Sequence, residues 1–155
     1  MRMLEVPGPR GLLSLHHRKA DLRSRVDVFA LALRLVSVAL LSADGWVHLH
    51  LWQDGYRHIS TIGPLFLTGA VSALVIAAVL LVRPSRLIAT SGFGLVMGIL
   101  AGLVASVNFG LFGFKEALSA PYAGESIALE IAAGAALATW TVVDLVKDRS
   151  GRATN

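Results

Sequence analysis

Cysteine is absent from this chain of 155 residues. Its absence excludes disulfide bonds, thiolate metal sites, thiol redox chemistry and cysteine nucleophiles. Charged residues are also scarce, at 15% of the chain against about 25% in an average soluble domain. Hydrophobic residues make up 55%, which is more than the soluble average of about 45–50%. We therefore expect a single small domain embedded in a membrane.

The net charge of +4 does not indicate nucleic-acid binding. Most of the basic residues flank apolar runs, where lysine and arginine orient membrane helices. The sequence has no basic face interleaved with aromatic residues, so nucleic acid is not an expected partner. The lipid bilayer is the expected partner.

Four long apolar runs are separated by short polar segments. About 20 apolar residues cross a bilayer as an α-helix, and the runs cover residues 26–52, 61–82, 87–109 and 126–146. We therefore expect an all-α fold, a four-helix transmembrane bundle over residues 26–146. A basic N-terminal segment, residues 1–25, and a polar tail, residues 147–155, flank it. Part of the basic segment is expected to lie along the membrane surface as an amphipathic helix.

Lysine and arginine are distributed unevenly between the two ends of the expected bundle. The N-terminal segment, the turn at residues 83–86 and the C-terminal tail hold nearly all of them. The other two connections hold only Arg57 and Lys115. Since the loops richest in these residues stay in the cytoplasm, both termini are expected to be cytoplasmic.

Small residues recur every four positions in the third run, at Gly94, Gly98, Gly102, Ser106 and Gly110. A doubled GxxxG pattern of this kind lets a second helix approach closely. We expect another helix of the same chain to pack against it.

Ionisable residues concentrate at the end of the first apolar run. Asp44 and His48 are four residues apart, so they share one face of the first helix. Glu130 is expected at a similar depth in the outer half of the fourth helix. In the inner half, Arg34 and Asp144 lie at matching depth, so we expect them to pair, or Arg34 to reach the cytoplasmic headgroups.

Two further histidines lie close by in the sequence. His50 is about 200° around the helix from His48, and it lines up with Trp46 and Asp54 instead. His58 lies in the connection that follows. Whether either histidine joins Asp44, His48 and Glu130 is left open by the spacing.

Three functions fit these residues. In the first, Asp44, His48 and Glu130, with His50 or His58, bind a divalent transition metal, because imidazole and carboxylate suit zinc, iron, manganese or Cu(II). In the second, the same groups bind protons or a polar ligand of the quinone type from the outer side. In the third, they hold the helices together in a small accessory or structural component of a larger membrane complex.

The third interpretation is the main prediction. A small bundle with a long ribbon of small residues and little soluble mass suits an accessory subunit, whose partner would be another membrane protein or a second copy of the chain. Nothing indicates a specific enzyme, because the sequence has no zincin motif, no Ser-His-Asp order and no nucleotide-binding glycine loop.

The first two helices carry a resemblance to a known group of proteins. It rests on His48-Leu49-His50-Leu51-Trp52, Gly55-Tyr56-Arg57-His58-Ile59 and Ile62-Gly63-Pro64-Leu65-Phe66. This pattern resembles small four-helix integral membrane proteins of high-GC Gram-positive bacteria. The resemblance implies a cytoplasmic-membrane location and transfers no activity. A weaker likeness to DoxX-type four-helix proteins rests on Arg34 and the number of helices.

Overall fold

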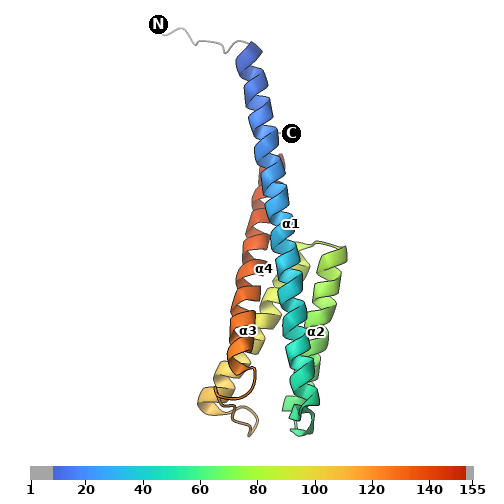
Figure 1. Ribbon diagram of the computed structural model, residues 1–155, viewed down its shortest axis with the longest axis vertical. Helices are drawn as coiled ribbons and strands as arrows, with labels where there is room; N and C mark the ends of the chain where they lie inside the picture. The colour runs from blue at the N-terminus through green and yellow to red at the C-terminus, as the bar shows by residue number, and fades with distance from the viewer. Residues whose placement is uncertain (1–8, 153–155) are drawn as a thin grey trace.

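The computed structural model describes residues 9–152, with side chains from residue 21 onward (Figure 1). These residues form the helices α1 (Pro9–Gln53), α2 (Ile62–Val82), α3 (Arg86–Phe109) and α4 (Ala123–Arg152), with a short 3-10 helix, η1 (Tyr56–His58), after α1. All four α-helices are long and apolar enough to cross a membrane. The expected all-α, four-helix bundle is therefore confirmed, and the chain is a multi-pass membrane protein.

α1 is one unbroken helix of 45 residues. It begins at Pro9, which suits the first position of a helix because no N–H is needed there. At a rise of 1.5 Å per residue its length is about 68 Å, more than twice the hydrocarbon thickness of a bilayer. The basic segment before residue 26 is therefore continuous with the first span from Pro9 onward (Figure 1). Residues 1–8 and 153–155, and the side chains of residues 9–20, lie outside the described part.

Proline and glycine account for the other helix ends. Pro84 stops α2 at Val82, because proline disfavours the helical conformation of the residue before it and donates no hydrogen bond. Gly110 ends α3 with a positive φ of 80°, a conformation that glycine adopts without strain.

The bundle has two distinct ends (Figure 1). We call the end that carries residues 54–61 and 110–122 the loop end. The opposite end carries the turn between α2 and α3. α1 packs against α2 and α4, and α3 packs against α4. α2 and α3 adjoin at their turn and diverge toward the loop end (Figure 1).

α1 and α2 approach each other closely at Gly45. A Cβ added to Gly45 of α1 would lie 2.8 Å from Cγ of Leu74 and 3.1 Å from the carbonyl oxygen of Ala70, both on α2. The packed apolar core extends from this contact through the middle of the bundle, and it consists of Leu41, Ala77, Leu80, Ala89, Val96, Ala133, Leu137 and Trp140.

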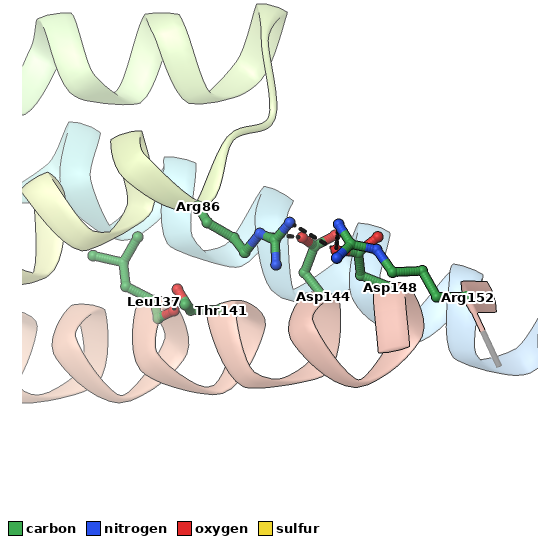
Figure 2. Close-up of polar contacts among 6 residues, drawn as sticks. All are labelled: Arg86, Leu137, Thr141, Asp144, Asp148 and Arg152. Carbon is green, nitrogen blue, oxygen red and sulfur yellow. Dashed lines mark hydrogen bonds and ion pairs between the residues drawn. The ribbon is translucent and has the colours of Figure 1, made fainter. Parts of the chain in front are cut away.

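Ion pairs join α3 to α4 at the end opposite the loop end (Figure 2). Arg86, the first residue of α3, lies 3.4 Å from Asp144 and 3.1 Å from Asp148. Within α4, Arg152 lies 3.2 Å from the same Asp148. Asp144 thus pairs with Arg86 and not with Arg34, because Arg86 begins its helix beside the last turns of α4. The Nε of Arg34 is buried and has no hydrogen-bond partner among the described residues.

Candidate metal and ligand site

Three ionisable side chains form a buried cluster between α1 and α4, in the half of the bundle near the loop end. Asp44 and Glu130 are fully buried, and His48 is 6% exposed. Each offers one ligand atom, and these atoms all lie within 4.8 Å of one another. At 1.5 Å per residue the three lie roughly 8–14 Å from the loop-end termini of their helices. The structure therefore brings together Asp44, His48 and Glu130, as their spacing and depth suggest.

The imidazole of His48 is held on two sides. Its Nδ1 lies 3.0 Å from the backbone carbonyl oxygen of Asp44, one turn earlier. Since a carbonyl oxygen only accepts, Nδ1 carries the proton in this hydrogen bond, and the Nε2 of the neutral ring keeps its lone pair. Metal-binding histidines commonly use this arrangement, in which the second nitrogen donates to a carbonyl or a carboxylate.

α2 supplies the other side of the His48 pocket. The ring centroids of His48 and Phe66 are 5.3 Å apart. A Cβ added to Gly69 would lie 3.5 Å from Cδ2 of the imidazole, which is ordinary van der Waals contact. The ring therefore packs directly on the backbone of α2, and its orientation is fixed.

The carboxylates of Asp44 and Glu130 lack partners in the described part of the chain. All four of their oxygens are buried without a hydrogen bond there, although Oδ1 of Asp44 lies 3.4 Å from Nδ1 of His48. No lysine or arginine of residues 21–152 forms an ion pair with either group. Arg34 precedes Asp44 by ten positions on α1, which is about 15 Å along the helix axis. An unpaired buried carboxylate costs several kcal/mol, so this pair needs protons or a cation.

A cleft of about 390 Å³ opens beside the cluster. His48 and Glu130 line it, and Asp44 does not. The walls come mainly from apolar residues of α2, α3 and the connection 110–122. Cavities of about 300–1,000 Å³ with a few polar groups are typical of small-molecule sites.

The glycines of α3 face this cleft. Gly94, Gly98 and Gly102 all line it, and apart from the adjoining backbone of α3 no atom of the described residues lies within 4 Å of a Cβ added to any of them. No helix of the described chain therefore packs closely on the GxxxG ribbon, in contrast to the expectation. The divergence of α2 from α3 toward the loop end leaves this face uncovered (Figure 1).

A hydrogen bond joins two residues that line the cleft. Tyr56 Oη donates to Oε2 of Glu116 over 2.6 Å, and both residues line the cleft. The backbone N–H of Glu116 donates to Oγ of the buried Ser106 over 3.2 Å. Sequence reasoning did not identify this contact. No sequence pattern pairs two irregular connections that are sixty residues apart. The one hint in the sequence was Ser106, which continues the four-residue spacing of the glycines in α3.

The other two candidate histidines do not join the cluster. Nε2 of His50 lies 3.2 Å from Oδ2 of Asp54, and the His50 ring stacks on Trp46 with centroids 5.0 Å apart. The predicted alignment of His50 with these two residues is confirmed. His58 is exposed, and its Nε2 accepts a hydrogen bond from Nε of Arg57.

Comparisons of the chain with protein-family models, with curated proteins and with solved structures find no match.

Proposed function

We propose that this protein binds a divalent transition metal within the membrane, with Asp44, His48 and Glu130 as its ligands. The observation that carries the proposal is a pair of fully buried carboxylates beside an oriented imidazole, with no hydrogen-bond donor to either carboxylate among residues 21–152. The charge of a divalent cation cancels that of two carboxylates. The loaded site would then be neutral, which suits its apolar surroundings.

The donor set restricts the metal. One imidazole nitrogen and two carboxylate oxygens suit zinc, iron or manganese, and they disfavour Cu(I), which prefers sulfur. In a tetrahedral zinc site with ligand distances of about 2.1 Å, ligand atoms lie roughly 3.4 Å apart. The ligand atoms here lie within 4.8 Å of one another, so side-chain movements on the order of 1 Å suffice. Because His48 and Glu130 line the cleft, the open coordination position would face it.

The cellular location and the orientation of the chain in the membrane are part of the same proposal. The resemblance of the first two helices to small membrane proteins of high-GC Gram-positive bacteria favours the cell membrane. The distribution of lysine and arginine favours both termini in the cytoplasm, which puts the cluster near the outer face. An accessory role in a larger membrane complex remains a prediction, and a resident metal is compatible with it.

Metal stoichiometry tests the proposal. The full chain is purified in detergent, stripped with a chelator, reloaded with Zn²⁺ or Mn²⁺, desalted and measured by elemental analysis. We expect one metal per chain in the wild type, and at least a tenfold weaker affinity in Glu130→Gln and His48→Ala. Each change removes one ligand, and the glutamine keeps the shape of the glutamate.

His50→Ala is the matched control. It removes an imidazole two residues from His48 but outside the cluster, so its metal content should equal that of the wild type. Far-UV circular dichroism of each variant establishes that it is folded, because removal of His50 from its stack on Trp46 would itself change tryptophan fluorescence. A folded wild type that retains no metal, or a Glu130→Gln variant that retains the full amount, would overturn the proposal.

A further inference from the structure

We infer that Arg34 and Arg83 together bind the phosphate group of an anionic phospholipid, at the end of the bundle opposite the loop end. This is a second binding function, and it does not depend on the metal. It rests on the register between α1 and α2, on the lack of partners for both arginines in the described chain, and on the depth at which they lie.

The packing of α1 against α2 puts the two arginines at the same level. Gly45 of α1 faces Ala70 and Leu74 of α2, whose atoms lie 3.1 and 2.8 Å from a Cβ added to it. Arg34 precedes Gly45 by eleven positions, about three turns of helix, so it lies on the same face of α1. Because α2 runs antiparallel to α1 (Figure 1), the position eleven residues beyond the midpoint of this contact is Arg83. With helix axes on the order of 10 Å apart, two arginine side chains can reach one anion between them.

Neither arginine has a partner among residues 21–152. Nε of Arg34 is buried without a hydrogen bond there, and neither Arg34 nor Arg83 forms an ion pair within this range. The described carboxylates at this end of the bundle are all paired with other basic side chains, in Asp21–Arg25, Asp27–Lys147, Asp144–Arg86, Asp148–Arg86 and Asp148–Arg152. An arginine at the edge of a membrane is costly without a counter-charge, so these two guanidinium groups need an anion from outside the described chain.

Phosphate is the anion that suits a pair of arginines. The planar guanidinium group presents parallel N–H donors, which bind two phosphate oxygens at once. A phosphate has enough oxygens to accept from two such groups on neighbouring helices. Basic pockets between transmembrane helices commonly hold the headgroups of anionic lipids, and the groove between α1 and α2 at this level is such a pocket.

The depth of the pair favours a lipid over an anion from solution. α2 has 21 residues, about 31 Å, so it ends near the boundary between the hydrocarbon and the headgroups. Arg83 follows its last residue, and Arg34 lies at the same level on α1. Large apolar side chains within three positions of the two arginines are exposed, namely Leu31, Leu35, Leu81 and Val82. The acyl chains of a bound phospholipid can cover this apolar surface, whereas inorganic phosphate cannot.

Lipid binding by the purified chain tests the inference. The full chain in a non-ionic detergent is titrated with phosphatidylglycerol and, separately, with phosphatidylcholine of the same acyl chains, and native mass spectrometry measures the fraction bound. We expect phosphatidylglycerol to bind at least tenfold more tightly, because its headgroup has no cation that neutralises the phosphate. Inorganic phosphate added at constant ionic strength should not displace it. Displacement would assign the two arginines to a free anion and overturn the lipid as the ligand.

Three variants test the location. Arg34→Gln and Arg83→Gln should each weaken phosphatidylglycerol binding at least fivefold. Arg149→Gln is the matched control, because it removes the same charge from an exposed position at the same end of the bundle, on α4, and it should change binding less than twofold. Arg83 is exposed, so its variant tests the inference even if Arg34→Gln does not fold.

Equal affinity for the two lipids, or equal effects of Arg83→Gln and Arg149→Gln, would overturn the inference. Metal content measured on the same samples keeps the two proposals separate, because both arginines lie far from the cluster and their variants should still bind metal.

Discussion

Tyr56 and Glu116 join the two connections at the loop end across one hydrogen bond of 2.6 Å. The phenol belongs to η1, directly after α1, and the carboxylate belongs to the connection between α3 and α4. Oε1 of the same glutamate accepts the backbone N–H of Ala117 over 3.0 Å. The Glu116 carboxylate therefore orders the connection between α3 and α4 and links it to η1.

The ionisation of Tyr56 gives a prediction about alkaline pH. Burial, and then the hydrogen bond to Glu116, raise the pKa of Tyr56 above the usual value of about 10. Between these two values an unfolded chain loses the proton while the folded chain keeps it. The stabilisation is therefore fully present below about pH 10 and is lost as the pH rises through the raised pKa.

Absorbance at 295 nm measures this ionisation. In Tyr122→Phe, Tyr56 is the one remaining tyrosine of the chain, and we expect no reversible tyrosinate signal at pH 10. Adding Glu116→Gln should bring the transition to lower pH, because the charge that opposes ionisation is gone. Reversible half-ionisation near pH 10 with Glu116 intact would contradict the hydrogen bond.

Two glycines should respond in opposite ways to alanine. A Cβ on Gly63 would meet only backbone, with the carbonyl oxygen of Tyr56 at 2.8 Å and Cα of Arg57 at 2.9 Å. Since backbone does not rotate away, Gly63→Ala should cost about 1–3 kcal/mol. Gly98→Ala meets nothing within 4 Å and should gain up to about 1 kcal/mol, because alanine favours the helix more than glycine does.

Thermal unfolding followed by tryptophan fluorescence compares these two variants in one detergent. Gly63→Ala should unfold at a lower temperature than the wild type, and Gly98→Ala at the same temperature or above it. A destabilised Gly98→Ala would mean that a helix covers the glycine ribbon after all.

The ion pairs at the other end of the bundle should be weakly stabilising and sensitive to salt. Arg86 lies between Asp144 and Asp148 (Figure 2), and all three side chains are more than a third exposed. Exposed pairs of this kind contribute about 0.2–1 kcal/mol. A double-mutant cycle of Arg86→Gln and Asp148→Asn should give a coupling energy in that range, which falls at high ionic strength. A coupling energy that salt does not change would indicate a pair that is buried.

Metal should stabilise the fold in proportion to its affinity. A ligand present at 100 times its dissociation constant adds about 2.7 kcal/mol to the stability of the folded state. Zn²⁺ or Mn²⁺ should therefore raise the unfolding temperature of the wild type and of His50→Ala. The same addition should leave Asp44→Asn and Glu130→Gln nearly unchanged. A shift of equal size in all four proteins would point to metal bound elsewhere on the chain.

The orientation in the membrane gives a fifth prediction. A fluorescent reporter that folds only in the cytoplasm should be active when it is fused after Asn155 and inactive when it is inserted at Lys115. The physical reason is the concentration of lysine and arginine at the end opposite the loop end. The reverse pattern would place the cluster near the inner face.

The sequence was informative where one local rule decides the outcome. Apolar length fixed the number of spans, and the four-residue spacing of Asp44 and His48 put both on one face. The position of Glu130 was predicted from its depth alone, which works in a membrane because every span crosses the same hydrocarbon thickness.

The cleft was not predictable in the same way. Whether a glycine ribbon meets a helix or lines a cavity depends on the angle between α2 and α3, and no single residue sets that angle. The partner of Asp144 was missed for a related reason. Residue counts put Arg34 and Arg86 at similar depths, and only the packing of α3 against α4 places Arg86 beside Asp144.

The cluster draws its ligands from the first helix and the last helix of the chain. During synthesis Asp44 and His48 enter the membrane before Glu130 has been made, at an insertion cost of about 2.5–3.5 kcal/mol for a central aspartate. The site is therefore completed only after α4 has been made. A nascent chain released before α4 would lack Glu130 and would carry only two of the three ligands.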